Sequence, residues 1–115
     1  MKLAEVVDEL DLKVRTAGGA LEREVRGGYA SDLMSDVIAH AEPGYLWVTL
    51  QIHQNVVAVA SLKELAGIVL VNGREPEEAT VERAESENIP IMVSPLPAFD
   101  VIGQLYGLGM AGGTD

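Results

Sequence analysis

The segment VTLQIHQN, residues 48–55, carries hydrogen-bonding or titrating side chains at every second position. Thr49, Gln51, His53 and Asn55 alternate there with mainly apolar residues. A hydroxyl, two amides and an imidazole at this spacing suit a metal centre, an acid–base site or the hydrogen-bonding mouth of a ligand pocket. The rest of the sequence has to decide among these three kinds of site.

A metal centre around His53 lacks the other ligands that it would need. The chain has no cysteine, and its other histidine, His40, falls in a different predicted helix. Protein zinc sites use three or four side-chain ligands. We therefore predict no metal site and no cofactor.

Recognisable catalytic motifs are also missing. The sequence contains no GxSxG, no HExxH and no phosphate-binding GxxxxGK[ST]. The glycine pairs at 18–19 and 27–28 do not form the GxGxxG of a dinucleotide-binding turn. Asp32 or His53 would serve as a base in a small enzyme, but no nucleophile or electrophile accompanies either. We predict a non-catalytic protein and keep the enzyme as the less favoured alternative.

The elements that must position these side chains alternate between strands and helices. Strands are predicted over residues 12–14, 45–50, 68–71 and 89–93, with a further extended segment over 21–30 that is interrupted by glycines 27–28. Helices are predicted over residues 2–10, 33–41, 56–66, 76–87 and 98–108, with Ser31 or Asp32 capping the second, Gly67 ending the third and Pro76 beginning the fourth. Such alternation, with continuously apolar strands, is typical of a parallel sheet covered on both faces. We predict a three-layer α/β/α sandwich with a mainly parallel central sheet.

Parallel strands end at the same edge of a sheet, and ligands of open α/β sheets bind outside those ends. We therefore predict a ligand-binding site at this edge. The candidate residues are Ser31, Asp32, Thr49, Gln51, His53, Asn55, Asn72, Gly73, Arg74 and Ser94. Each also has a purely structural interpretation. The first two suit a helix cap, Asn72-Gly73 suits a turn, Ser94 precedes a proline, and the amides of Gln51 and Asn55 suit buried backbone groups.

The composition limits the class of partner. The 115 residues carry a formal charge of −10, which disfavours nucleic acid and anionic membrane surfaces. The N-terminus lacks the basic start and apolar run of a signal peptide, and no apolar run reaches membrane-spanning length. We predict one cytoplasmic domain over residues 1–110, with a flexible tail over 111–115.

Three stretches in order resemble a DRTGG domain, in particular its small stand-alone versions. They are EREVRGGYASDLMSD, YLWVTLQIHQNVVAVASLKELAGIVLVNGREP and ENIPIMVSPLPAFDVIGQLY, and the resemblance covers residues 1–110. The Asp-Arg that helps to name the family would fall near Leu50-Gln51, and its Thr-Gly-Gly at residues 71–73. Only Gly73 is retained, so Gln51, His53 and Asn72 would have to recognise a more neutral group.

The resemblance implies a regulatory or architectural role without an established reaction. Such domains lie beside nucleotide-sensing CBS domains in regulated pyrophosphatases and precede the catalytic part of some phosphotransacetylases. Their fold is similar to that of the N-terminal domain of HPr kinase/phosphorylase, whose P-loop kinase domain this chain lacks. Stand-alone members also occur in settings of iron-only hydrogenase genes, which implies an accessory role.

Two functional hypotheses follow from the sequence. In the first, the protein senses a small nucleotide or phosphorylated metabolite at the strand ends. In the second, it is an interaction module that forms a homodimer and docks on a partner enzyme through apolar residues such as Leu96, Phe99 and Tyr106.

Overall fold

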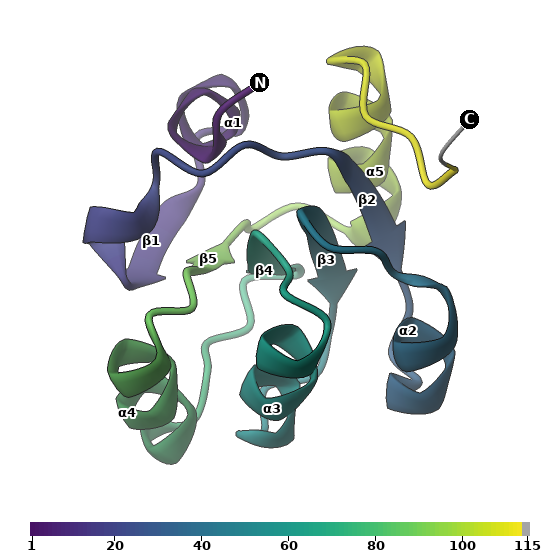
Figure 1. Ribbon diagram of the computed structural model, residues 1–115. Helices are drawn as coiled ribbons and strands as arrows, with labels where there is room; N and C mark the ends of the chain where they lie inside the picture. Colours follow the sequence, from purple (N-terminus) through teal and green to yellow (C-terminus); the bar gives the residue numbers. More distant parts are fainter. Residues whose placement is uncertain (114–115) are drawn as a thin grey trace.

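A five-stranded sheet forms the centre of the computed structural model, which describes residues 1–113 (Figure 1). The strands lie in the order β1 (Lys13–Thr16), β5 (Ile91–Val93), β4 (Gly67–Leu70), β3 (Tyr45–Thr49) and β2 (Gly27–Ala30). Neighbours from β5 to β2 are parallel, and β1 alone is antiparallel to its neighbour. The predicted three-layer sandwich with a mainly parallel sheet is confirmed.

Helices cover both faces of the sheet. On one face lie α2 (Met34–His40), α3 (Asn55–Leu62) and α4 (Glu78–Glu87), and on the other lie α1 (Leu3–Leu10) and α5 (Ala98–Gly107), as Figure 1 shows. A short 3₁₀ helix, η1 (Gly18–Ala20), follows β1. Every residue of β3, β4 and β5 is buried, which explains their continuously apolar sequences.

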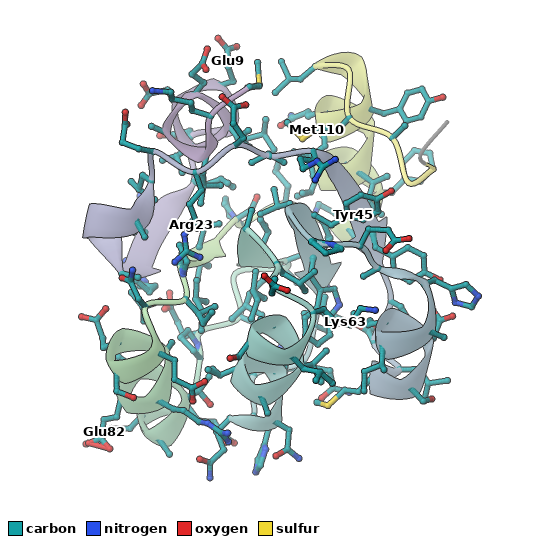
Figure 2. The ribbon with its side chains drawn as sticks, viewed as in Figure 1. Glu9, Arg23, Tyr45, Lys63, Glu82 and Met110 are labelled. Carbon is teal, nitrogen blue, oxygen red and sulfur yellow. The ribbon has the colours of Figure 1, made fainter. Side chains whose placement is uncertain are left out.

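The two faces of β3 carry the two halves of an aliphatic core. Trp47 belongs to the cluster beneath α2, α3 and α4, whereas Leu46 and Val48 belong to the cluster beneath α1 and α5. This alternation follows from the two-residue period of a strand. Met110, labelled in Figure 2, completes the second cluster from beyond the end of α5.

Glycine placement corrects two of the predicted boundaries. Gly27 and Gly28 do not interrupt the extended segment but begin β2. A Cβ on Gly27 would lie 2.6 Å from the carbonyl oxygen of Ala111 and 2.8 Å from the ring of Tyr45, so only glycine fits there. Gly67 begins β4 rather than ending a helix. That helix, α3, has already stopped at Leu62, with Glu64 in the left-handed conformation.

Two predicted helix starts are also wrong. Neither Ser31 nor Asp32 is the N-cap of α2, because Leu33 occupies that position and makes no side-chain cap. Pro76 does not begin α4, whose N-cap is Glu77. At both places the polar or proline residue belongs to the loop between strand end and helix.

The outer edges of β1 and β2 differ in how they are protected from pairing with another strand. In β1 the register shifts between Val14 and Thr16, and Lys13 and Arg15 are exposed. Beside β2 runs the end of the described chain. The Gly28 N–H donates to the carbonyl of Ala111 at 3.1 Å, and the Tyr45 hydroxyl donates to the carbonyl of Gly112 at 3.2 Å. The flexible tail predicted for residues 111–115 stays a prediction, and residues 114–115 lie outside the described part.

The acidic side chains lie at the outer surface. Glu9 and Glu82, labelled in Figure 2, point away from the sheet on opposite sides of the molecule. Within residues 1–113, no helix has both the length and the apolar character needed to cross a membrane.

Candidate functional site

The parallel strands β2, β3, β4 and β5 end at one edge of the sheet, which we call the strand-end rim. The rim comprises the loops 31–33, 50–54, 71–77 and 94–97, which follow these four strands. All ten predicted site residues except Thr49 and Asn55, which lie at the adjoining strand and helix termini, fall in these loops. The structure therefore brings the candidates to one edge, whereas ligand binding by them stays a prediction.

Two adjoining depressions open on the rim. The first, the rim cleft, has a volume of about 430 Å³ and is lined by Asp32, Leu50, Gln51, Ile52, His53, Arg74 and Glu77. The second, the inner pocket, has a volume of about 190 Å³ and is lined by Ala30, Ser31, Asp32, Val48, Thr49, Leu50, Val71 and Ala98. Asp32 and Leu50 line both, so they form the boundary between the two depressions.

Asp32 is held in place by the residues that end β3. Its Oδ1 accepts hydrogen bonds from the Thr49 hydroxyl at 2.8 Å and from the Leu50 N–H at 2.7 Å. Both bonds use the same oxygen, which leaves Oδ2 of an exposed carboxylate for a ligand. Asp32 thus presents an oriented negative group to both depressions.

Gln51 and His53 are oriented by local hydrogen bonds. The Gln51 side-chain amide donates to the Asp32 carbonyl at 3.0 Å, so its Oε1 is the group that a ligand would meet. The His53 Nδ1 accepts from the Asn55 N–H at 3.1 Å. That bond places the proton of a neutral imidazole on Nε2, which makes His53 a hydrogen-bond donor toward a ligand.

Residue 77 lines the rim cleft although it was not predicted as a site residue. The Glu77 N–H donates to the Ile52 carbonyl at 3.2 Å, and the buried Thr80 hydroxyl donates to the same oxygen at 2.7 Å. These bonds dock the start of α4 on the loop after β3. The place of Glu77 in the loop that follows β4 was the signal that could have identified it.

Four predicted site residues line neither depression and have structural roles instead. Asn72 and Gly73 adopt positive φ angles of 57° and 66°, and their N–H groups donate to the carbonyls of Leu96 and Ser94, each at 2.8 Å. The buried Ser94 hydroxyl accepts from the Leu96 N–H. Asn55 is the first residue of α3. The structural interpretation therefore describes what the geometry shows for Asn72 and Gly73, whereas the side chain of Asn55 is exposed and does not serve a buried backbone group as predicted.

A second polar cluster lies beside the rim, where β2 meets α2. The Tyr29 hydroxyl donates to the Asp36 carboxylate at 2.9 Å, and His40 Nδ1 lies 3.0 Å from the same group. Hydrogen bonds from Ser31 and Tyr29, together with His40, lower the pKa of Asp36 below its usual 3.8. The hydrogen bond to Asp36 conversely raises the pKa of Tyr29.

This cluster gives the fold an acid-sensitive contribution. A depressed carboxyl pKa stabilises the folded state above the unfolded-state pKa, and this contribution is lost as the pH falls through the folded-state value. We expect the melting temperature of the protein to fall below about pH 4, and to fall less steeply in Asp36→Asn. Thermal unfolding followed by circular dichroism from neutral pH downward measures both slopes. Parallel curves for the two proteins would contradict the assignment, and Asp8→Asn on α1 controls for the lost charge.

Among residues 1–113, no three histidine, cysteine or acidic side chains gather closely enough to hold a metal ion. The rim offers an aspartate, a glutamate, an arginine, an amide and an imidazole. It is suited to hydrogen bonding and charge recognition.

No family model and no curated protein matches the sequence. Among solved structures, the fold is similar to that of the CBS and DRTGG domains of the regulatory region of Clostridium perfringens pyrophosphatase, complexed with its activator diadenosine tetraphosphate. The TM-score is 0.72 at 12% sequence identity, over 90% of this chain and 45% of that chain. The chain therefore has a DRTGG-like fold, as the resemblance implied, and it spans less than half the length of this structural neighbour.

Proposed function

We propose that this chain with a DRTGG-like fold is a non-catalytic regulatory module that binds a small metabolite in the rim cleft. The observation that carries the proposal is the orientation of Asp32. Its carboxylate is fixed by Thr49 and Leu50, and it lies between two depressions with one oxygen uncommitted. A preorganised acceptor of this kind loses little conformational entropy when a ligand binds.

The chemistry of the rim cleft defines the ligand. Asp32, Glu77 and the Gln51 Oε1 accept hydrogen bonds, whereas Arg74 and His53 donate them. Hydroxyl or amino groups of a ligand match the acceptors, and a single phosphate matches Arg74. A nucleoside or sugar monophosphate satisfies both sets. That the similar pyrophosphatase region was solved with a dinucleotide activator supports testing nucleotides first.

We expect Asp32→Asn to weaken such a ligand about tenfold or more, because hydrogen bonds to a charged carboxylate are stronger than those to an amide. Asparagine keeps the Oδ1 acceptor for Thr49 and Leu50, so the fold should survive. Thermal shift against nucleosides, nucleoside monophosphates and sugar phosphates identifies the best compound, and calorimetry then compares the variants. Asp8→Asn removes the same charge from an exposed position on α1 and should bind normally.

Two results would contradict the proposal. One is a panel in which no compound raises the melting temperature at millimolar concentration. The other is a compound that binds Asp32→Asn and the Asp8→Asn control equally well, because the carboxylate would then play no part.

Protein association is a second candidate role, favoured by the exposed aromatic side chains Phe99 and Tyr106 on α5. An accessory role on a partner enzyme, such as a component of a hydrogenase system, stays a prediction of the family resemblance. The predicted cytoplasmic location also stays a prediction.

A further inference from the structure

Helix α5 presents an apolar surface that residues 1–113 leave exposed. Phe99 is 87% exposed, Tyr106 is 70% exposed and Ile102 is 39% exposed. Their spacing of three, four and seven residues places them on one side of the helix. Leu96, which the sequence suggested as part of this surface, is instead partly buried against the core. Clustered exposed aromatic residues usually mark an interaction site.

Gly103 lies between Phe99 and Tyr106 along this helix, and Gly107 follows Tyr106. A Cβ on Gly103 or on Gly107 would meet nothing within 4 Å, so the packing of this chain does not require glycine at either place. Gly103 lies in the interior of α5, where glycine destabilises a helix relative to alanine. A helix surface without side chains at this place would allow a second backbone to approach closely.

An apolar groove continues the surface toward the open side of β2. It has a volume of about 80 Å³, and its lining includes Tyr29, Ala30, Ile102, Tyr106 and Met110. The groove is mainly apolar, whereas the rim cleft is lined by charged and polar residues, and the two share no lining residue.

We infer that α5 pairs with α5 of a second copy in an antiparallel, two-fold symmetric dimer centred on Gly103. Symmetry then places Phe99 of one copy at the level of Gly107 of the other, which has no side chain to obstruct the phenyl ring. The same symmetry places Tyr106 of one copy at the level of Asp100 of the other. The surface is therefore complementary to itself, as a two-fold interface must be.

Charge favours a second copy over a basic partner. The chain carries a net charge of −10, yet residues 98–107 include one charged side chain, Asp100. Two copies would meet here with the least mutual repulsion. A basic protein or peptide would instead be drawn to the acidic surfaces elsewhere on the molecule.

The surface area that the two copies would bury indicates a weak dimer. A buried aromatic side chain removes roughly 200 Å² from water, so the exposed parts of Phe99 and Tyr106 supply roughly 300 Å² per copy. With the contributions of Ile102 and the groove, the total for two copies approaches the roughly 1,000 Å² of a small specific interface. Association in the micromolar range is the expected strength.

Sedimentation velocity of the full chain, from low micromolar to near-millimolar concentration, tests the dimer. The wild type should show a concentration-dependent shift from monomer to dimer. Phe99→Ser should weaken association about tenfold or more, because aromatic anchors dominate interface energetics. Leu62→Ser on α3 is the matched control, since Leu62 is 67% exposed but lies on the other face of the sheet.

Gly103→Gln separates this interface from a general loss of stability. Glutamine is a good helix former, so the melting temperature of the dilute monomer should rise by a few degrees while the dimer weakens. A wild type that stays monomeric throughout overturns the proposal. So does a dimer that Phe99→Ser and Gly103→Gln leave intact, or one that Leu62→Ser weakens as much as Phe99→Ser. None of these results bears on ligand binding in the rim cleft.

Discussion

Replacing Trp47 with alanine is expected to lower the free energy of unfolding by about 3–5 kcal/mol. A domain of this size has a total stability of roughly 6–17 kcal/mol, so the variant would keep only part of it. Trp47 is fully buried at the centre of β3, packed beneath α2, α3 and α4. Its indole N–H also donates to the Ser31 carbonyl at 2.8 Å, which ties the first rim loop to the core.

Urea denaturation followed by far-ultraviolet circular dichroism measures this loss without needing the indole signal. Trp47→Phe is the informative companion, because it keeps an aromatic ring but removes the N–H that Ser31 accepts. We expect an intermediate loss for it, together with weaker binding in the rim cleft as the loop at residues 31–33 loosens. A Trp47→Ala variant as stable as Trp47→Phe would show that burial of an aromatic ring at this position contributes little.

The second large effect is expected at Thr16, in the irregular pairing between β1 and β5. Its buried hydroxyl donates to the Ile89 carbonyl at 2.7 Å and accepts from the Ile91 N–H at 2.8 Å. Thr16→Val keeps the shape of the side chain but leaves both backbone groups buried and unpaired. We expect a loss of about 2–4 kcal/mol.

Thr16→Ser distinguishes the hydroxyl from the methyl group. Serine can make both hydrogen bonds, so its cost should be limited to about 1 kcal/mol for the missing methyl group. Equal losses for the two variants in urea denaturation would indicate that packing, and not the two hydrogen bonds, holds β1 on the sheet.

The alternation of strands and helices after residue 45 was predictable because the strands there are continuously apolar. The continuously apolar runs IVLV and IMV can be buried only inside a covered sheet, and the structure places them there. The left-handed end of α4 at Asn88 agrees with a residue preference, since asparagine tolerates that conformation.

The glycine positions were misinterpreted because tertiary contacts decide them. Gly27 is explained by the ring of Tyr45 and the carbonyl of Ala111, which are distant in sequence. Gly67 follows a helix end that Glu64 makes by adopting positive φ, which no residue preference predicts.

The candidate site was predictable as a location but not as a set of side chains. Parallel topology brings the loops together, whereas side-chain orientation depends on hydrogen bonds between loops. The hydrogen bond from Gln51 to Asp32 joins the loop after β3 to the loop after β2. The hydrogen bond from Glu77 to Ile52 joins the loop after β4 to the loop after β3. Sequence reasoning therefore selected Ser94, whose hydroxyl accepts a hydrogen bond from the Leu96 N–H, and missed Glu77.

The protection of the two outer strands has a consequence for the protein at high concentration. An unpaired strand edge can template the growth of fibres, in which copies add one after another without limit. Here β1 is irregular and carries exposed cationic side chains, and the outward N–H of Gly28 in β2 is already occupied by Ala111. Neither outer edge of the sheet therefore offers a regular strand on which another copy could pair. Concentrated solutions should therefore remain free of amyloid-like polymers.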